Sequence, residues 1–184
     1  MILDRDFSLN RYGLHVRLVN EDDAEYILNL RTDHKLGRFL SKTVNDLEVQ
    51  KQWIRDYKKR EALGLEYYFI YLHQGERIGV NRIYNINFSE KSATAGSWIC
   101  SPNLSFELPL YTVVLFREIF FDLLELEIDF FDTRKENKKV IRMHNILGAH
   151  KIGENDLDIF HTLTKQDFML NKPKFLKYID TSTS

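Results

Sequence analysis

The sequence predicts an α/β fold in which strands and helices are interspersed along one domain. Segments with helical spacing of apolar residues and segments rich in aromatic and β-branched residues follow one another in the order β-α-α-β-β-β-α-β-α-β. Aromatic residues make up 13% of the 184 residues, a share that suits a sheet better than a helical bundle. We expect residues 1–184 to form a single domain, because a chain of this length buries a proper core, with a poorly defined segment at 1–14.

The composition argues against several functional classes. The formal net charge is −1, which provides neither the basic surface of a nucleic-acid-binding protein nor a polybasic membrane patch. A single cysteine, Cys100, excludes an internal disulfide framework. The first ten residues carry charges where a signal peptide needs an apolar core, and no apolar run approaches the roughly 20 residues of a membrane span. We therefore expect a cytoplasmic protein without a nucleic-acid or membrane partner.

The first third of the chain predicts one strand and two helices. His15–Val19 is a short alternating strand. A helix follows over Glu21–Asp33, with Asn20 as its candidate N-cap and acidic residues in its first turn. A second helix begins after a cap at Asn45 or Asp46 and runs to about residue 62.

The middle of the chain predicts three strands and a long apolar helix. Glu66–Leu72 and Arg77–Ile86 flank the turn sequence HQGE, which is typical of a β-hairpin. Ser92–Cys100 is the next strand, and Gly96 in its middle indicates a bulge or a close backbone approach. The apolar segment Leu108–Leu124 then predicts a helix.

The run DTRKENKKVIRMHNILG, Asp132–Gly148, is the most informative stretch of the chain. It follows a buried strand at Leu126–Phe131 and predicts a compact helix that starts at Asn137 and stops at Gly148. Asn137 and His144 are seven residues apart, about two helical turns, so they share one face of this helix. The chain ends with two further predicted elements, a strand near Leu157–Leu163 and a short helix opened by Thr164 and Asp167.

This run, with Asn, two apolar residues, a ring-bearing residue and then Leu-Gly, resembles the acetyl-coenzyme A signature of the GCN5-related N-acetyltransferase (GNAT) superfamily. The segments HVRLV, EDDAEYILNLRTD, RFLS, EYYFIY, GERIGVNRIY, GSWI and RKENKKVIRMHNILGA resemble a branch found in nucleotide-sugar and surface-polysaccharide pathways, and they cover most of residues 15–170. The resemblance implies a mixed, mostly antiparallel sheet with helices on both faces. It also implies acetyl-coenzyme A (acetyl-CoA) as co-substrate and no metal.

The resemblance also implies roles for particular residues. Asn137 would contact the pantetheine arm of the co-substrate, and His144 stands where the family usually has a Tyr near the thioester sulfur. An imidazole with its ordinary pKa near ~6.5 can donate a proton when charged and a hydrogen bond when neutral, so His144 is the catalytic candidate. The alternatives are that His144 is a surface histidine and that Asn137 is only a helix cap. The full set of implied co-substrate contacts is Trp98, Ile99, Cys100, Asn103, Ser105, Asn137, Ile141 and His144.

The segment Ser101–Leu110, SPNLSFELPL, departs from the family pattern. The family places a Gly-rich phosphate loop here, whereas no Gly occurs between Ser97 and Leu110, and Glu107 adds negative charge. Asn103 and Ser105 could form a looser phosphate site, and the alternative is a plain strand-to-helix connection. Among residues 98–100, whose backbone amides are the implied oxyanion donors, Cys100 has no sequence cue for an activating base, which argues against a nucleophile.

Basic residues indicate where an acceptor with phosphates would bind. Arg31, Lys35 and Arg38 are spaced i, i+4 and i+7, a basic stripe if the first helix persists past Gly37. Arg31 and Arg38, with Arg82 and Tyr84 on a nearby strand, could hold a nucleotide diphosphate, because Arg pairs with phosphate bidentately. The alternative is a solvated helix face.

Three functions remain open at this level. The first is an acetyl-CoA-dependent N-acetyltransferase acting on the amino group of a nucleotide-linked amino sugar. The second is an acetyltransferase for a protein N-terminus or a small amine, of the ribosomal-protein-acetylating type. The third is a non-catalytic acyl-CoA-binding module, which the Gly-free loop favours. The spacing selects no general base among Tyr84, Glu21 and Glu66, and exposed strand edges are compatible with a homodimer.

Overall fold

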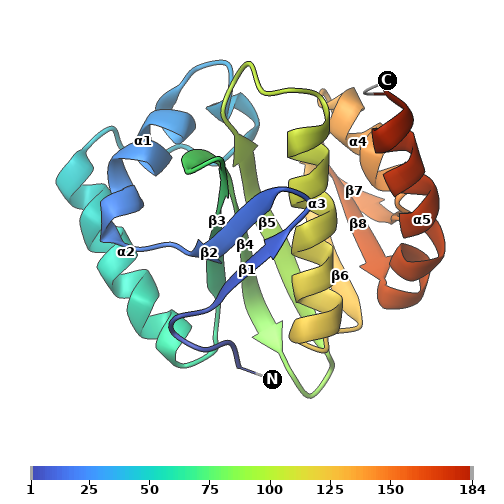
Figure 1. The fold of residues 1–184 in the computed structure, drawn as a ribbon, viewed down its shortest axis with the longest axis horizontal. Coiled ribbons are helices and arrows are strands. Elements are labelled where there is room, and N and C mark those ends of the chain that lie inside the picture. Colours follow the sequence, from blue (N-terminus) through green and yellow to red (C-terminus); the bar gives the residue numbers. More distant parts are fainter. Residues whose placement is uncertain (1, 183–184) are drawn as a thin grey trace.

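A computed structural model describes residues 2–182 of the chain (Figure 1). Eight strands form one sheet in the order β1-β2-β3-β4-β5-β6-β8-β7. The strands are β1 (Ser8–Arg11), β2 (Leu14–Leu18), β3 (Tyr67–His73), β4 (Glu76–Asn87), β5 (Ser92–Cys100), β6 (Ile128–Arg134), β7 (His150–Glu154) and β8 (Asp158–Thr164). All neighbouring strands pair antiparallel except β5 and β6, which are parallel.

Helices cover both faces of this sheet, in two groups that Figure 1 shows on opposite sides of the view. The helices are α1 (Ala24–Thr32), α2 (Leu47–Ala62), α3 (Glu107–Glu118), α4 (Lys138–Ile146) and α5 (Lys165–Ser182). Helices α1 and α2 bury residues such as Ile27 and Tyr57 in a smaller core with β3 and β4. Helices α3, α4 and α5 share a larger, aromatic core with the other face. The predicted mixed, mostly antiparallel sheet with helices on both faces is confirmed.

Local signals in the sequence placed several boundaries correctly. Strand β5 spans the predicted Ser92–Cys100. Helix α2 begins after Asp46, whose Oδ1 accepts hydrogen bonds from the backbone N–H groups of Glu48 (2.9 Å) and Val49 (3.1 Å). The predicted cap at Asn20 is also present, and it opens a 3₁₀ turn that leads into α1. These features depend on side chains a few residues away, which is why the sequence alone specifies them.

The predicted basic stripe on the first helix is wrong. Helix α1 ends at Thr32, and the carboxylate of Asp33 accepts hydrogen bonds from the N–H groups of Lys35 and Leu36, both at 2.8 Å. The chain then folds back so tightly that a Cβ on Gly37 would lie 2.1 Å from the carbonyl oxygen of Arg31. Arg31, Lys35 and Arg38 therefore do not share a helix face.

Four other parts of the fold differ from the sequence prediction. Segment 1–14 contains strand β1, which forms a hairpin with β2, and β7 is a second strand that the sequence pattern did not predict. Both β1 and β7 are edge strands with mostly exposed side chains, so they lack the apolar alternation that marks a strand. The apolar helix α3 passes into a π-helical turn at Ile119–Leu123. The final helix, predicted to be short, has 18 residues, although Thr164 does cap it by accepting from the Asp167 N–H at 3.1 Å.

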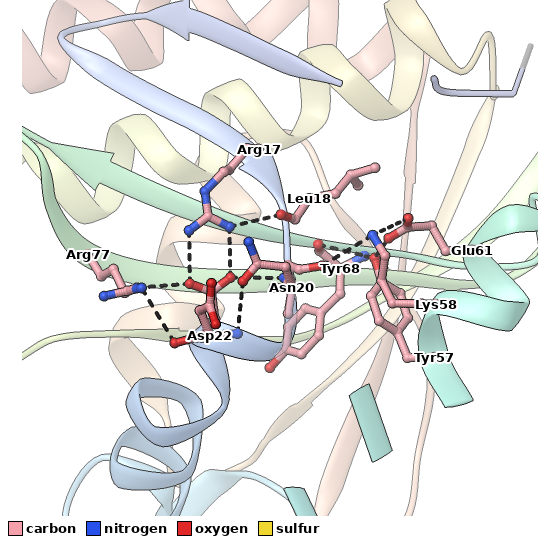
Figure 2. A network of polar contacts seen from close by, with 11 residues as sticks. Arg17, Leu18, Asn20, Asp22, Tyr57, Lys58, Glu61, Tyr68 and Arg77 are labelled. Carbon is pink, nitrogen blue, oxygen red and sulfur yellow. Dashed lines mark hydrogen bonds and ion pairs between the residues drawn. The ribbon is translucent and has the colours of Figure 1, made fainter. Parts of the chain in front are cut away.

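A polar network fixes the α1–α2 layer to the sheet. Asp23, fully buried at the start of α1, accepts hydrogen bonds from Arg17 on β2 (2.7 and 2.9 Å), Arg77 on β4 (2.8 Å) and the N–H of Asn20 (2.9 Å). Figure 2 shows both guanidinium groups converging on this turn. Burial alone would raise the pKa of Asp23, but these hydrogen bonds lower it, so the carboxylate remains charged. The layer that forms one wall of the site below is thus held at a defined position.

Within residues 2–182, no helix combines the length and apolar character that crossing a membrane requires.

Candidate active site

A cleft opens where β5 and β6 separate. Their parallel pairing is limited to three residue pairs and ends at Thr94 and Phe130. Beyond that point β6 stays paired with β8, while β5 continues alongside β4. The cleft has a volume of about 300 Å³ and is lined by residues of α3 and α4 and of the segment that joins α1 to α2. Its lining residues are Phe39, Leu40, Ser41, Asn81, Tyr84, Ala95, Gly96, Ser97, Trp98, Val113, Arg117, Phe131, Asp132, Thr133, Arg134, Asn137, Val140 and His144.

A buried ion pair lies at the point of divergence. The Asp129 carboxylate accepts a hydrogen bond from the N–H of Ala95 (3.2 Å), the first β5 residue beyond the parallel ladder. Its other oxygen lies 3.0 Å from Nε of Arg117 on α3. Burial raises the pKa of Asp129 to about 6, although the Arg117 charge opposes the rise. The Asp129 carboxylate thus accepts the hydrogen bond from the Ala95 N–H that a backbone carbonyl of β6 would accept if the two strands stayed paired.

A bulge in β5 forms one wall of the cleft. On β4, Asn81 alone stands opposite two β5 residues, Ser97 and Trp98, because Val80 pairs with Ile99 and Arg82 pairs with Gly96. Ser97 adopts φ 55°, the left-handed region. The predicted bulge beside Gly96 is confirmed. It leaves a stretch of backbone without regular ladder partners at the cleft, where amides can face a ligand.

Helix α4 forms the opposite wall. Asn137, Val140 and His144 all line the cleft, which confirms that Asn137 and His144 share one helix face. The side chain of Asn137 makes no capping hydrogen bond, so the cap-only alternative is wrong and its amide is available to a ligand. The surface alternative for His144 is wrong too, because only 7% of it is exposed and its ring lies 4.4 Å from that of Phe131.

The environment of His144 decides its charge. Burial lowers its pKa well below the usual value, and the charges of Arg117 and His161 lower it further. The imidazole is therefore neutral at pH 7. The protonated form is therefore not available at pH 7, and a neutral imidazole can only donate or accept a hydrogen bond.

The strand residues next to the bulge are divided between the cleft and the core. Trp98 lines the cleft, and its Nε1–H donates to Thr112 Oγ1 at 3.0 Å. Ile99 and Cys100 line neither this cleft nor the pocket described below. The side chain of Ile99 packs in the α1–α2 core instead. Burial raises the pKa of Cys100 to about 12, so its thiol is not a nucleophile at neutral pH. Ile141, half-buried on α4, also lies outside the cleft lining.

The Gly-free connection between β5 and α3 is exposed. Asn103 and Ser105 both lie on it, and Asn103 adopts φ 61°. Helix α3 has no side-chain N-cap, but few N–H groups of its first turn are open to an anion. The Leu108 N–H donates to the carbonyl oxygen of Ser105 at 3.3 Å, and Pro109 has no N–H. Hydrogen bonding from Ser105 lowers the pKa of Glu107, which keeps a negative charge at this helix end.

A second cavity, here called the side pocket, adjoins the cleft and shares Ser41 and Ser97 with it. It also measures about 300 Å³. Three of its lining residues are cationic, and no carboxylate belongs to that lining within residues 2–182. The lining residues are Arg31, Ser41, Lys42, Thr43, Val44, Val49, Gln50, Trp53, Tyr68, Arg82 and Ser97.

Two of the predicted acceptor residues are held rigidly in the side pocket. Arg31 donates to Thr43 Oγ1 at 2.7 Å and to Ser41 Oγ at 2.9 Å. The Arg82 guanidinium lies 5.0 Å from the ring centres of both Trp53 and Tyr84.

The other predicted residues lie elsewhere. Tyr84 lines the cleft, whereas Arg38 is exposed over the ring of Phe39 and lines neither cavity. Of the acids considered as bases, Glu21 pairs with Arg55 at the surface. Glu66 contacts Arg60 with one oxygen and Arg82 with the other.

The sequence patterns do not single out several residues of the site. Asp129 carried a usable signal, since a charged residue inside an apolar strand is expected to be buried with a partner. Arg117, Asp132 and Lys42 carried none, because their positions depend on strands and loops far apart in the chain. Within residues 2–182, no group of three or more His, Cys, Asp or Glu side chains is arranged to hold a metal ion.

Comparisons with known proteins agree with this geometry. Residues 14–150 match the family described as "Acetyltransferase (GNAT) domain". The solved structure of apo FdhC, described as a nucleotide-linked sugar GNAT, is 35% identical with a TM-score of 0.83, and covers 95% of this chain and 99% of that one.

Two more distant structures share the fold. Ribosomal-protein-S5-alanine acetyltransferase from Vibrio fischeri is 20% identical (TM-score 0.74, covering 89% of this chain and 99% of that one). Spermidine N-acetyltransferase from Vibrio cholerae, solved with CoA and spermine, is 17% identical (TM-score 0.75, 86% and 99%). A search among curated protein sequences returned no match.

Proposed function

Because this chain belongs to the GNAT family of acetyltransferases, we propose that it transfers an acetyl group from acetyl-CoA to the amino group of a nucleotide-linked amino sugar. The observation that carries this acceptor assignment is the side pocket. It has three cationic residues and no carboxylate in its lining, and it opens into the cleft at Ser41 and Ser97. A sugar in the cleft would therefore have its phosphates in a cationic pocket.

The two arginines of the side pocket suit a diphosphate. A guanidinium presents paired donors to phosphate oxygens, and Arg31 and Arg82 are both fixed by other groups before a ligand arrives. Lys42 adds a third positive charge at the exposed rim. Trp53 supplies an aromatic wall against which a nucleoside can pack.

The cleft residues fit the acyl end of acetyl-CoA, which supplies the reactive thioester. Backbone N–H groups at the Ser97–Trp98 bulge would stabilise negative charge developing on the carbonyl oxygen. Asn137 would bond the pantetheine arm, and the neutral His144 imidazole would donate a hydrogen bond to the departing sulfur. The exposed connection before α3 would receive the phosphates through Asn103 and Ser105, with the Glu107 charge weakening that contact.

The same charges argue against a polyamine acceptor. A polycation in the side pocket would meet Arg31 and Lys42 as like charges, while the Arg82 charge is paired with Glu66, and such contacts disfavour the wrong partner.

A panel of acceptors tests the proposal. We expect the amino-sugar nucleotide to have a higher kcat/KM than spermidine or an N-terminal peptide, measured by release of the CoA thiol. Arg31→Ala or Arg82→Ala should raise the KM for that acceptor about 10- to 100-fold, since a hydrogen bond to a charged group contributes about 1.5–3 kcal/mol. Arg5→Ala, an exposed site outside both cavities, is the matched control. Preference for a polycation or a peptide would contradict the acceptor assignment.

A further inference from the structure

Asp132 is the one carboxylate in the lining of the cleft within residues 2–182. It lies on β6 two residues beyond Phe130, which is the last residue paired with β5. Residues two apart in a strand point to the same face, and the partner of Phe130 is Thr94, so Asp132 is level with Gly96 across the gap. Asp132 thus stands where the two strands have just separated.

Tyr84 reaches toward the same gap from the β4 side. Its strand partner is Thr94, and its ring lies over Gly96, where an added Cβ would be 2.9 Å from Tyr84 Cε1 and 3.1 Å from its hydroxyl oxygen. Tyr84, Gly96 and Asp132 therefore follow one another across one face of the sheet, the face that carries Arg82 and the side pocket. Because Gly96 has no side chain, the Tyr84 ring can lie against the β5 backbone, beside the gap in which Asp132 stands.

The other acids near the cleft are occupied by cations. Glu66 contacts Arg60 and Arg82, Asp129 contacts Arg117, and Asp158 contacts Arg134 at 3.2 Å. Within residues 2–182, Asp132 has no ion-pair partner, and its carboxylate accepts a hydrogen bond only from its own backbone N–H. Its lone pairs are available to a ligand in the cleft.

We propose that Asp132 is the general base of the reaction, which binds the ammonium group of the acceptor and removes its proton. This assignment rests on transfer to an amine, whichever acceptor carries it. The Tyr84 hydroxyl, opposite Asp132 across Gly96, is positioned to hydrogen-bond the acceptor beside the reacting nitrogen.

The step balances without any further reactant. The acceptor R–NH₃⁺ gives one proton to the Asp132 carboxylate, which leaves a neutral amine and a carboxylic acid. The amine nitrogen bonds to the thioester carbonyl carbon as the carbon–sulfur bond breaks. The second proton of that nitrogen goes to the departing sulfur, and Asp132 releases its proton to water. The net products are the amide, the CoA thiol and one proton.

The surroundings of Asp132 make its carboxylate a stronger base than an ordinary aspartate. Burial raises its pKa, the Asp158 charge on β8 adds to this, and the charges of Arg134 and His161 oppose it. Burial also raises the pKa of Tyr84, and the Asp132 charge adds to that rise, so the tyrosine stays protonated as a donor. A carboxylate with a raised pKa takes a proton from an ammonium group more readily than one with an ordinary pKa.

Asp132→Asn tests the proposal because it removes the basic oxygen with little change in shape. With a basic amine, kcat/KM at pH 7 should fall about 10²- to 10⁴-fold, the usual contribution of a general base. The loss should shrink as the pH is raised through the pKa of the acceptor amine, since solvent then removes the proton. An acceptor whose amine is already neutral at pH 7 should react at nearly the wild-type rate.

Asp156→Asn, in the exposed turn between β7 and β8, is the matched control and should keep wild-type activity. Calorimetry with a nucleoside diphosphate should give equal affinity for wild type and Asp132→Asn, which separates proton transfer from a damaged pocket. Full activity of Asp132→Asn toward the basic amine, or an equal loss with both amines at every pH, would overturn the assignment.

The acceptor assignment and the general-base assignment are tested by different outcomes. If the amino-sugar nucleotide does not react but another basic amine does, the acceptor assignment is wrong and Asp132→Asn is tested with that amine. If the amino-sugar nucleotide reacts equally well in wild type and Asp132→Asn, the general base is wrong and the acceptor assignment stands.

Discussion

At the scale of single residues, Asp129 shows how one buried charge shapes the site. It lies in a strand whose neighbouring side chains are apolar, contacts Arg117 at 3.0 Å and accepts from the Ala95 N–H at 3.2 Å. The side chain of Arg117 is itself only 3% exposed. A buried pair of this kind contributes little net stability compared with apolar residues, but removing one member leaves the other charge buried alone. The pair therefore acts by setting where β5 leaves β6.

We predict that Asp129→Ala lowers the free energy of unfolding by about 3–5 kcal/mol, the usual effect of breaking a buried ion pair. The double variant Asp129→Leu/Arg117→Met should recover much of this loss, because it leaves no unpaired charge. Urea denaturation at pH 7 measures both. A loss below about 1 kcal/mol in Asp129→Ala would show that the pair is not buried as described.

His144 makes a prediction about acid stability. Its pKa is lowered by burial and by the Arg117 and His161 charges, so below pH ~6.5 the unfolded chain binds a proton there that the folded chain does not. That difference in bound protons makes the folded state less stable as the pH falls. Asp129 acts in the opposite sense. Its folded pKa is about 6, above the unfolded value near ~3.9, so its contribution to stability falls as the pH rises through that interval.

Replacing His144 with Phe should therefore remove the acid penalty of that site. Relative to wild type, the unfolding free energy of the variant should improve below pH ~6.5, by at most about 1.4 kcal/mol per pH unit. Denaturation curves between pH 5 and 7.5 measure this. His34→Phe, in the exposed turn after α1, is the control, and identical pH dependence in the two variants would contradict a buried neutral imidazole at 144.

At the scale of elements, helix α2 contributes both to the core and to the side pocket. It buries Ile54 and Tyr57 against the sheet, and its first turns supply Val49, Gln50 and Trp53 to the side pocket. Both depend on the start of the helix, where the Asp46 carboxylate accepts from two N–H groups. Fraying of the first turn would therefore weaken binding of the acceptor before it disturbs the packing of Ile54 and Tyr57 in the core.

We predict that Asp46→Ala costs about 0.5–2 kcal/mol of stability, the usual effect of losing an N-cap, and raises the KM of the acceptor more than that of acetyl-CoA. Asp46→Asn should behave as wild type, since Asn caps equally well. Thermal unfolding and steady-state kinetics test both parts. Equal changes in the two KM values would argue against a link between this cap and the side pocket.

At the scale of the whole molecule, the cleft runs through the sheet between its two helical layers. The α3–α4 side offers Asn103 and Ser105 before α3 and Asn137 on α4, and the α1–α2 side offers the cationic pocket. The two substrates can therefore approach from opposite faces and meet between β5 and β6. The homodimer expected from strand edges stays a prediction.

Binding of acetyl-CoA should stabilise the whole fold. At 100 times Kd a ligand adds about 2.7 kcal/mol, which for a domain of this size corresponds to a rise in Tm of about 5–10 °C. Asn137→Ala should reduce that rise at a fixed ligand concentration, because it removes a hydrogen bond of about 1 kcal/mol. Asn145→Ala, on the exposed side of α4, should not. The same rise in both variants would remove Asn137 from the co-substrate site.

The sequence by itself determined what depends on neighbours along the chain. Apolar spacing and caps such as Asp46 specify the helices and inner strands, and the seven-residue interval specifies that Asn137 and His144 share a face. The tertiary structure alone decided what depends on residues distant in the chain. The edge strands β1 and β7 form by pairing, and the charge of His144 is set by burial and by Arg117. The roles of Asp129 and Asp132 follow from the separation of β5 and β6. The local spacing of apolar residues predicts which side of an element is buried. It does not predict which charged groups and strands pack against that side.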